Sequence, residues 1–168
     1  HIDAIEIDIQ AADQATENAI ASPWAERIKI YNINAKEFQA NKSYDLIISN
    51  PPFYENELKS GNTSKDIAHH SNELQLIELM AIIKEKMSPD GVFCFLLPYK
   101  RNTEVKKLLY EAGFAITQIT LVRQSTRHDF FRIMLMGRLK KSVVTETIID
   151  EISIKDENGA YTPYFTEL

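Results

Sequence analysis

The chain has 168 residues, of which 44% are hydrophobic and 26% are charged, a composition typical of one globular domain with a sizeable core. No apolar run approaches the roughly 18 residues that span a bilayer, and no signal-peptide pattern is present, so we expect a cytoplasmic protein. The single cysteine, Cys94, excludes a disulfide framework and a cysteine metal cluster.

The net charge of −5 argues against a nonspecific nucleic-acid-binding protein, but the charge is unevenly distributed along the chain. Residues 1–99 carry a net charge of −7, residues 100–141 one of +7, and residues 142–168 one of −5. The middle segment is either a localised contact for a polyanion or a solvated helix face followed by a tail. Its basic residues, called the basic block below, are Lys100, Arg101, Lys106, Lys107, Arg123, Arg127, Arg132, Arg138, Lys140 and Lys141.

The hydrophobic pattern predicts strands and helices that alternate as far as Gly113. In chain order they are a strand at 2–7, a helix at 10–21, strands at 28–32 and 44–49, a helix at 73–87 stopped by residues 88–91, a strand at 92–97 and a helix at 103–112. This alternation predicts βαβ units in a Rossmann-like α/β fold, an open and mostly parallel sheet with helices on both faces.

The C-terminal third breaks the alternation. Strands are predicted at 114–122 and 130–137 with only a polar loop between them, followed by an extended segment at 143–154 and a turn at 156–159. We therefore expect an antiparallel strand near the C-terminal end of a single domain over residues 1–168. The first glycine is Gly61, so we also expect that a first strand and its glycine-rich loop lie upstream of His1.

Polar side chains follow three of the predicted strands, where ligands bind in open α/β sheets. They are Glu6 with Asp8, Asn34, and Asn50. A carboxylate at such a strand end can accept hydrogen bonds from both hydroxyls of a ribose, and Glu6 is better placed for this than Asp8. The alternative is that the charge of Glu6 stabilises the N-terminus of the following helix.

The stretch DLIISNPPFY, residues 45–54, joins a buried strand directly to an amide, two prolines and two aromatic residues. The Asn50 side chain offers a hydrogen-bond acceptor that is not a base near neutral pH, and Pro51 fixes the backbone beside it. Two rigid acceptors can receive both hydrogens of a planar NH₂ group and aim its lone pair at an electrophile, while Phe53 stacks on the flat group that carries it. The alternative is a strand followed by a proline turn with core aromatics.

These residues resemble the signature of class I, Rossmann-like S-adenosylmethionine-dependent methyltransferases that modify exocyclic or amide nitrogens. Within that family the chain is similar to the bacterial enzymes that methylate N6 of an adenine beside the anticodon of valine tRNA. The resemblance covers nearly the whole chain and is carried by residues 4–8, 17–18, 22–28, 44–54, 67–70 and 91–98 and by Arg132.

The resemblance implies S-adenosylmethionine as cofactor. Glu6, with Ile7 beside it, is expected to bind the cofactor ribose, and Asn50 is expected to lie against the cofactor as well. Asn34 and Ala35 fall where the family contacts the cofactor adenine. The family usually has an aspartate at the position of Asn34, so this contact lacks charge assistance here.

The resemblance also implies a tRNA substrate, with no metal and no membrane, and it leaves the oligomeric state open, a monomer included. Asn50 and the Pro51 carbonyl are expected to hold the target amine, and Phe53 to stack on the target base. Further substrate contacts are expected from Pro52, Tyr54, Lys100, Arg101, Arg127 and Arg132.

Two alternatives remain open. One is a protein methyltransferase acting on a release-factor glutamine amide, because that family shares an Asn-Pro-Pro-aromatic motif. The other is a catalytically inert methyltransferase-like domain that binds RNA or protein, which the missing glycine loop and Asn34 favour. Comparing methyl transfer to tRNA and to release factor would test the first alternative, and the sequence upstream of His1 would test the second.

Overall fold

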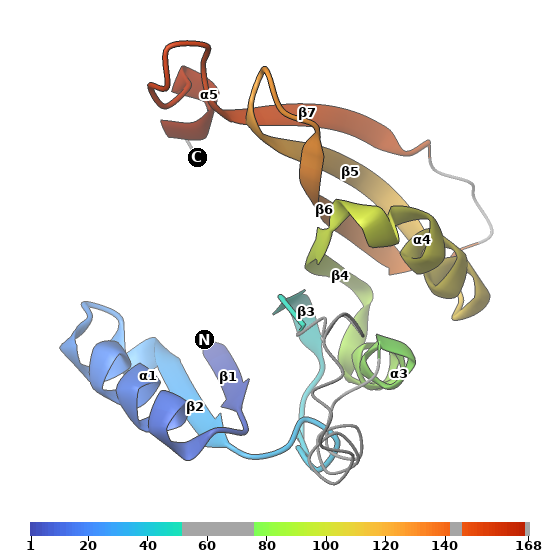
Figure 1. Cartoon of the computed structure of the whole chain (residues 1–168). Helices are drawn as coiled ribbons and strands as arrows, with labels where there is room; N and C mark the ends of the chain where they lie inside the picture. Colours follow the sequence, from blue (N-terminus) through green and yellow to red (C-terminus); the bar gives the residue numbers. More distant parts are fainter. Residues whose placement is uncertain (52–75, 142–145, 167–168) are drawn as a thin grey trace, which may run out of the picture. The chain divides into compact units, whose positions relative to one another are not determined.

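A computed structural model of the chain describes residues 1–51, 76–141 and 146–166 (Figure 1). The backbone divides into two compact units, residues 1–41 and residues 42–168, and each is described by itself. The single methyltransferase domain expected over residues 1–168 stays a prediction.

The first unit is a βαβ arrangement. Strand β1 (Ile2–Glu6) leads through helix α1 (Ile9–Ala21) and the short helix η1 (Ala25–Arg27) to strand β2 (Ile28–Asn32), which pairs with β1 in parallel. Asp8 caps α1, because its Oδ1 accepts the Ala11 N–H at 2.9 Å. The register pairs Glu6 with Asn32, so both strands end at the same edge of this sheet.

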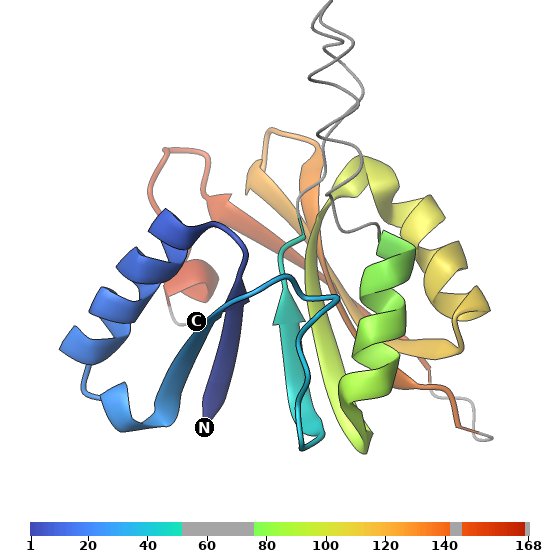
Figure 2. The same cartoon turned by 90° about the horizontal axis from the view of Figure 1, so that it is seen from below.

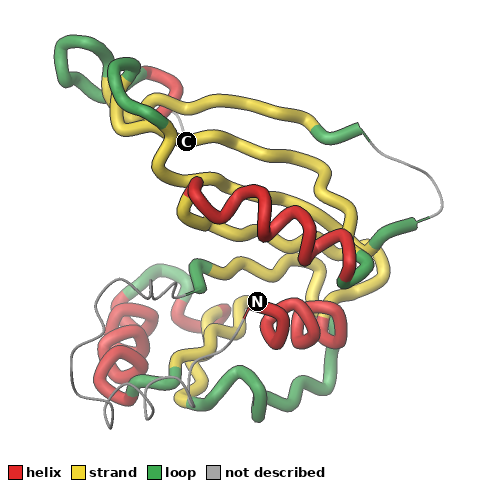
Figure 3. The backbone as a smooth tube through the Cα atoms, turned by 45° about the vertical axis from the view of Figure 1, so that its right-hand side comes forward, coloured by secondary structure: helices red, strands yellow, loops and turns green. Residues whose placement is uncertain are grey.

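The second unit contains a five-stranded sheet in the order β3-β4-β6-β5-β7, whose strands run side by side in Figure 3. Its elements are β3 (Tyr44–Ser49), α3 (Leu76–Lys86), β4 (Met87–Pro98), η2 (Tyr99–Arg101), α4 (Asn102–Glu111), β5 (Phe114–Ser125), β6 (Phe130–Leu139), β7 (Ile148–Lys155) and α5 (Pro163–Thr166). Strand β6 is antiparallel to both neighbours, whereas the β3–β4 and β5–β7 pairs are parallel. The α/β class and the antiparallel strand near the C-terminal end are confirmed.

The apolar core of this unit lies between one face of the sheet and helices α3 and α4, which cover the same side of it (Figure 2). Alternate residues of β4 face these helices, and Phe93, Phe95 and Leu97 are almost completely buried. The Phe93 ring occupies the place where Gly137 would carry a side chain, because an added Cβ would lie 2.6 Å from Phe93 Cζ. Gly137 is therefore required by the packing of β6 against β4.

Several element boundaries differ from the sequence prediction; the extended segment predicted at 143–154, for example, contains β7 only from Ile148 onward, to Lys155. Helix α3 ends at Lys86, as the Ser88–Gly91 stretch predicts. Strand β4 begins at once, because Met87 already pairs with Tyr44, and the residues between Met87 and Val92 form a bulge before Val92 pairs with Leu46. Strand β5 extends past residue 122, where it pairs with β7, and β6 extends past residue 137, where Leu139 pairs with Phe114. These extensions depend on partners distant in sequence.

No helix in segments 1–51, 76–141 and 146–166 is long and apolar enough to cross a bilayer. Across the same segments, no three His, Cys, Asp or Glu side chains gather as they would around a metal ion.

Candidate active site

The turn between β1 and α1 carries the predicted ribose-binding carboxylate. Glu6 is the last residue of β1, and its Oε1 accepts the backbone N–H of Asp8 at 2.8 Å. Asp8 itself is used as the cap of α1. Each of the two carboxylates thus accepts one backbone N–H within this turn and keeps further acceptor capacity, and the ribose-binding role of Glu6 stays a prediction.

Asn32 holds this turn in place from the neighbouring strand. Its Nδ2 donates to the carbonyl oxygens of Glu6 and Ile7 at 3.0 and 3.1 Å, and the backbone N–H of Ile33 also donates to the Glu6 oxygen at 3.1 Å. Asn32 was not among the residues predicted for the site. A polar amide at the end of a strand, two residues before Asn34, is the signal that was available for it.

Asn34 and Ala35 follow β2 in a tight turn at the same edge of the small sheet. Asn34 Oδ1 accepts the Lys36 N–H at 2.9 Å, and the Asn34 carbonyl accepts the Glu37 N–H at 2.9 Å. Glu6, Ile7, Asn34 and Ala35 are thus brought to one edge, at the ends of two parallel strands. The Asn34 side chain shapes its own loop.

The motif that follows β3 begins within the described residues and continues beyond them. Asn50 is exposed, and Pro51 is buried. Strand β3 ends at Ser49, which pairs with Phe95, so Asn50 and Pro51 leave the sheet beside the last residues of β4. Pro52, Phe53 and Tyr54 lie outside the described residues.

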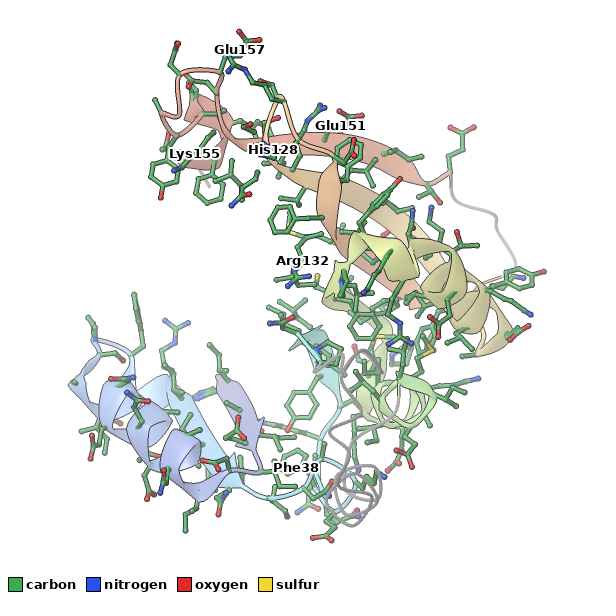
Figure 4. All side chains as sticks on the ribbon, in the orientation of Figure 1. Phe38, His128, Arg132, Glu151, Lys155 and Glu157 are labelled. Carbon is green, nitrogen blue, oxygen red and sulfur yellow. The ribbon has the colours of Figure 1, made fainter. Side chains whose placement is uncertain are left out.

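Four basic side chains of the predicted substrate site lie at the edge where β3, β4, β5 and β7 end and β6 begins, called the carboxyl edge below. Lys100 and Arg101 follow β4 in η2, Arg127 lies between β5 and β6, and Arg132 pairs with Pro98. Figure 4 shows Arg132 extending from β6 away from α4. The structure thus places these four residues and Asn50 at one edge of one sheet.

Arg101 is held by a bidentate contact to Glu104, with Nε–Oε2 and Nη2–Oε1 distances of 2.9 and 2.6 Å. The hydrogen bond to Glu104 raises the pKa of Arg101, and the same bond lowers the pKa of Glu104. A phosphate that approached Arg101 would therefore compete with Glu104 for the guanidinium.

The basic block does not form one surface. Arg138 lies near the end of β6, and Lys140 and Lys141 follow the strand, at the opposite edge of the sheet, called the amino edge below. There the ammonium group of Lys140 sits 4.2 Å from the Tyr110 ring centroid, and Lys141 contacts Asp90. The continuous run of charge in the sequence is divided by the fold.

Comparisons with known proteins identify the family. A model of the RMKL-like, methyltransferase domain family matches residues 1–129. A Dyadobacter fermentans protein named tRNA1(Val) (adenine(37)-N6)-methyltransferase is 34% identical over 99% of this chain and 70% of its own length. A Flavobacterium johnsoniae protein of the same name is 31% identical over 99% of this chain and 71% of its own length.

Solved structures share the fold at low identity. A predicted O-methyltransferase from Agrobacterium tumefaciens superposes with a TM-score of 0.70 at 13% identity, over 98% of this chain and 74% of that one. The glycopeptide N-methyltransferase MtfA complexed with S-adenosyl-L-methionine gives a TM-score of 0.60 at 11% identity, over 83% and 72% of the two chains. The resemblance inferred from the sequence is confirmed by the family match, and the fold by these structures.

Proposed function

Because the chain belongs to the family of RMKL-like methyltransferase domains, we propose that it methylates the exocyclic N6 amine of an adenine beside the anticodon of a tRNA, valine tRNA. It is an S-adenosylmethionine-dependent N-methyltransferase. The observation that carries the proposal is the match, over nearly the whole chain, to relatives named for this reaction, together with the position of Asn50 at the carboxyl end of β3.

The β1–α1 turn fits the ribose of the cofactor. Glu6 presents a carboxylate whose orientation is fixed by the Asp8 N–H, and Asn32 fixes the backbone on which Glu6 and Ile7 stand. A carboxylate held in this way can accept hydrogen bonds from vicinal hydroxyls. S-adenosylmethionine, when bound, supplies an electrophilic methyl group.

Asn50 orients the amine that receives the methyl group. Its amide oxygen and the Pro51 carbonyl accept the two hydrogens of the target NH₂ group, so that the nitrogen lone pair points away from the base plane. The acceptors are neutral and stabilise the positive charge that develops on the nitrogen during transfer. The stacking predicted for Phe53, and the contacts predicted for Pro52 and Tyr54, remain part of this proposal.

The carboxyl edge binds the tRNA backbone. Lys100, Arg101, Arg127 and Arg132 are proposed to contact phosphates, which position the RNA without reading its sequence. Binding is therefore expected to weaken steeply as salt is added. A tRNA substrate also places the enzyme in the cytoplasm.

Nucleoside mass spectrometry of valine tRNA tests the reaction in cells. We expect N6-methyladenosine beside the anticodon to disappear when the gene is deleted and to return with the wild-type gene. An Asn50→Ala copy should not restore it, whereas Asn158→Ala, the same change in the exposed turn after β7, should. Modification by the Asn50→Ala copy would contradict the role given to this amide.

A parallel assay with purified full-length enzyme compares labelled methyl transfer to valine tRNA and to a release factor. The proposal requires transfer to the RNA. Transfer to the release-factor glutamine alone would replace it with the protein methyltransferase, and transfer to neither would favour the inert domain.

A further inference from the structure

An aromatic and basic row crosses the carboxyl edge of the larger sheet on the side of α4. The Tyr99 and Phe130 rings lie 5.6 Å apart, tilted by 46°, and the guanidinium carbon of Arg123 lies 5.0 Å from the centroid of Phe130. Tyr99 follows β4, Phe130 begins β6, and Arg123 is directly opposite Phe130 on β5. The row, defined as Tyr99, Phe130 and Arg123, follows the order of the strands in the sheet.

The row lies beyond the apolar core. On β4 and β6 the core ends with the completely buried pair Leu97 and Ile133, and within the described residues neither Tyr99 nor Phe130 belongs to it. Tyr99 is 37% exposed, and Phe131, beside the row, is 42% exposed. These neighbouring aromatic rings, which lie outside the core formed by the described residues and are partly exposed, are available to contact a ligand.

Strand β7 holds Arg123 in position. Arg123 Nε donates to Ser153 Oγ at 3.0 Å, and its Nη2 donates to Glu151 Oε2 at 2.5 Å. Both partners belong to β7, and Ser153 is directly opposite Arg123 in the parallel pairing. Arg123 is therefore oriented by two polar contacts on one side and supports Phe130 on the other.

We propose that the Tyr99–Phe130–Arg123 row is a stacking platform for an unpaired base of the RNA, a base that flanks the target adenine. The inference rests on the proposed function and names an additional contact for its substrate. Aromatic side chains stack on bases regardless of sequence, and an arginine plane extends such a platform. Tyr99 is the exposed member that meets the base, while Arg123 is a positioning residue.

The surroundings favour RNA over other partners. The carboxyl edge also carries Asn50 and Arg132, and the guanidinium carbon of Arg132 lies 5.7 Å from the Phe131 ring centroid. Aromatic rings and arginines gathered at one edge of a sheet are the pattern expected where bases stack and phosphates approach nearby.

The test uses the full-length enzyme and an anticodon stem-loop RNA that carries 2-aminopurine beside the target adenine. Stacking quenches the fluorescence of this base analogue. The test variant is Tyr99→Leu, and Tyr99→Phe keeps the ring. Tyr110→Leu is the matched control, because Tyr110 is also an exposed tyrosine, 66% accessible, beside a cation, but lies at the amino edge.

We expect Tyr99→Leu to raise the Kd for the RNA by about 5- to 150-fold, the range for losing one stacked base, and to abolish the quenching. Tyr99→Phe and Tyr110→Leu should bind and quench like the wild type. Replacing Ser153 with alanine should weaken the quenching in part, because it loosens Arg123. The Kd for S-adenosylmethionine should not change in any of these variants, which also shows that they are folded.

The outcomes separate this inference from the proposed function. If the wild type methylates the RNA but Tyr99→Leu binds and quenches normally, the platform is wrong and the proposed function stands. Quenching that depends on Tyr99 in an enzyme that transfers no methyl group would support the platform and overturn the reaction. If the wild type neither binds nor methylates the RNA, both fall.

Discussion

Replacing Asn32 with alanine is expected to weaken cofactor binding, although Asn32 itself is not proposed to contact the cofactor. The Asn32 side chain donates to the Glu6 and Ile7 carbonyls at 3.0 and 3.1 Å. A net intramolecular hydrogen bond contributes about 0.5–1.5 kcal/mol, and because Asn32 is exposed we take the low end, about 1 kcal/mol for the two. If this free energy holds the turn in its binding conformation, the Kd rises about fivefold.

Isothermal titration of S-adenosylmethionine into full-length protein measures this effect, with Asn18→Ala on the exposed face of α1 as the matched control. Thermal unfolding of both variants is recorded alongside. A lower melting temperature for Asn32→Ala with an unchanged Kd would refute the assignment of the β1–α1 turn to the cofactor. An unchanged melting temperature and an unchanged Kd would refute the role of the two hydrogen bonds.

Three further predictions concern packing and protonation. Gly137→Ala should destabilise the protein by about 1–3 kcal/mol, because the added Cβ would lie 2.6 Å from the Phe93 ring. This should lower the melting temperature by roughly 2–12 °C, and an unchanged melting temperature would contradict this packing. Arg101 lowers the pKa of Glu104, so their contact stabilises the fold above pH 4.5, the ordinary pKa of the group, and this stabilisation is lost as the pH falls through the lowered pKa. Glu104→Gln should therefore cost under about 1 kcal/mol of stability at neutral pH and nothing in acid, as measured by thermal melts at a series of pH values. A cost that persists at low pH would rule out this contact as its source. Burial raises the pKa of the Cys94 thiol, so iodoacetamide should react more slowly with the folded protein than with the urea-unfolded one, and equal rates would show that the thiol is not sheltered.

Local sequence signals were sufficient for most of the elements. The strands at 28–32 and 44–49 have the predicted bounds, because apolar runs bounded by polar residues mark buried strands. Gly113, predicted as a helix stop, follows α4 with a φ of 86°, a conformation that a glycine adopts without strain. Where the chain contains its own stop and start signals, no tertiary information was needed.

Contacts between strands were not predictable in the same way. Arg123 was one of ten cations in the basic block, and nothing local indicates that it meets Glu151 and Ser153 on β7. Asn32 was not singled out, because its function depends on the β1–β2 register that places it opposite Glu6. A register is fixed by the packing of the whole sheet, so a residue that acts through a neighbouring strand is visible only once the sheet is assembled.

The divided basic block shows why counting charge along a chain overestimates contact with a polyanion. Arg101, Lys107, Arg123 and Lys141 each form an ion pair with a carboxylate of this protein. A phosphate that approaches such a cation must compete with its partner, so the free energy gained is smaller than for an unpaired charge. Arg138, Lys140 and Lys141 are moreover at the opposite edge of the sheet from Asn50. The charge that matters for RNA binding is therefore the part that the fold gathers at the carboxyl edge, where exposed rings lie beside it, and this quantity cannot be obtained from net charge.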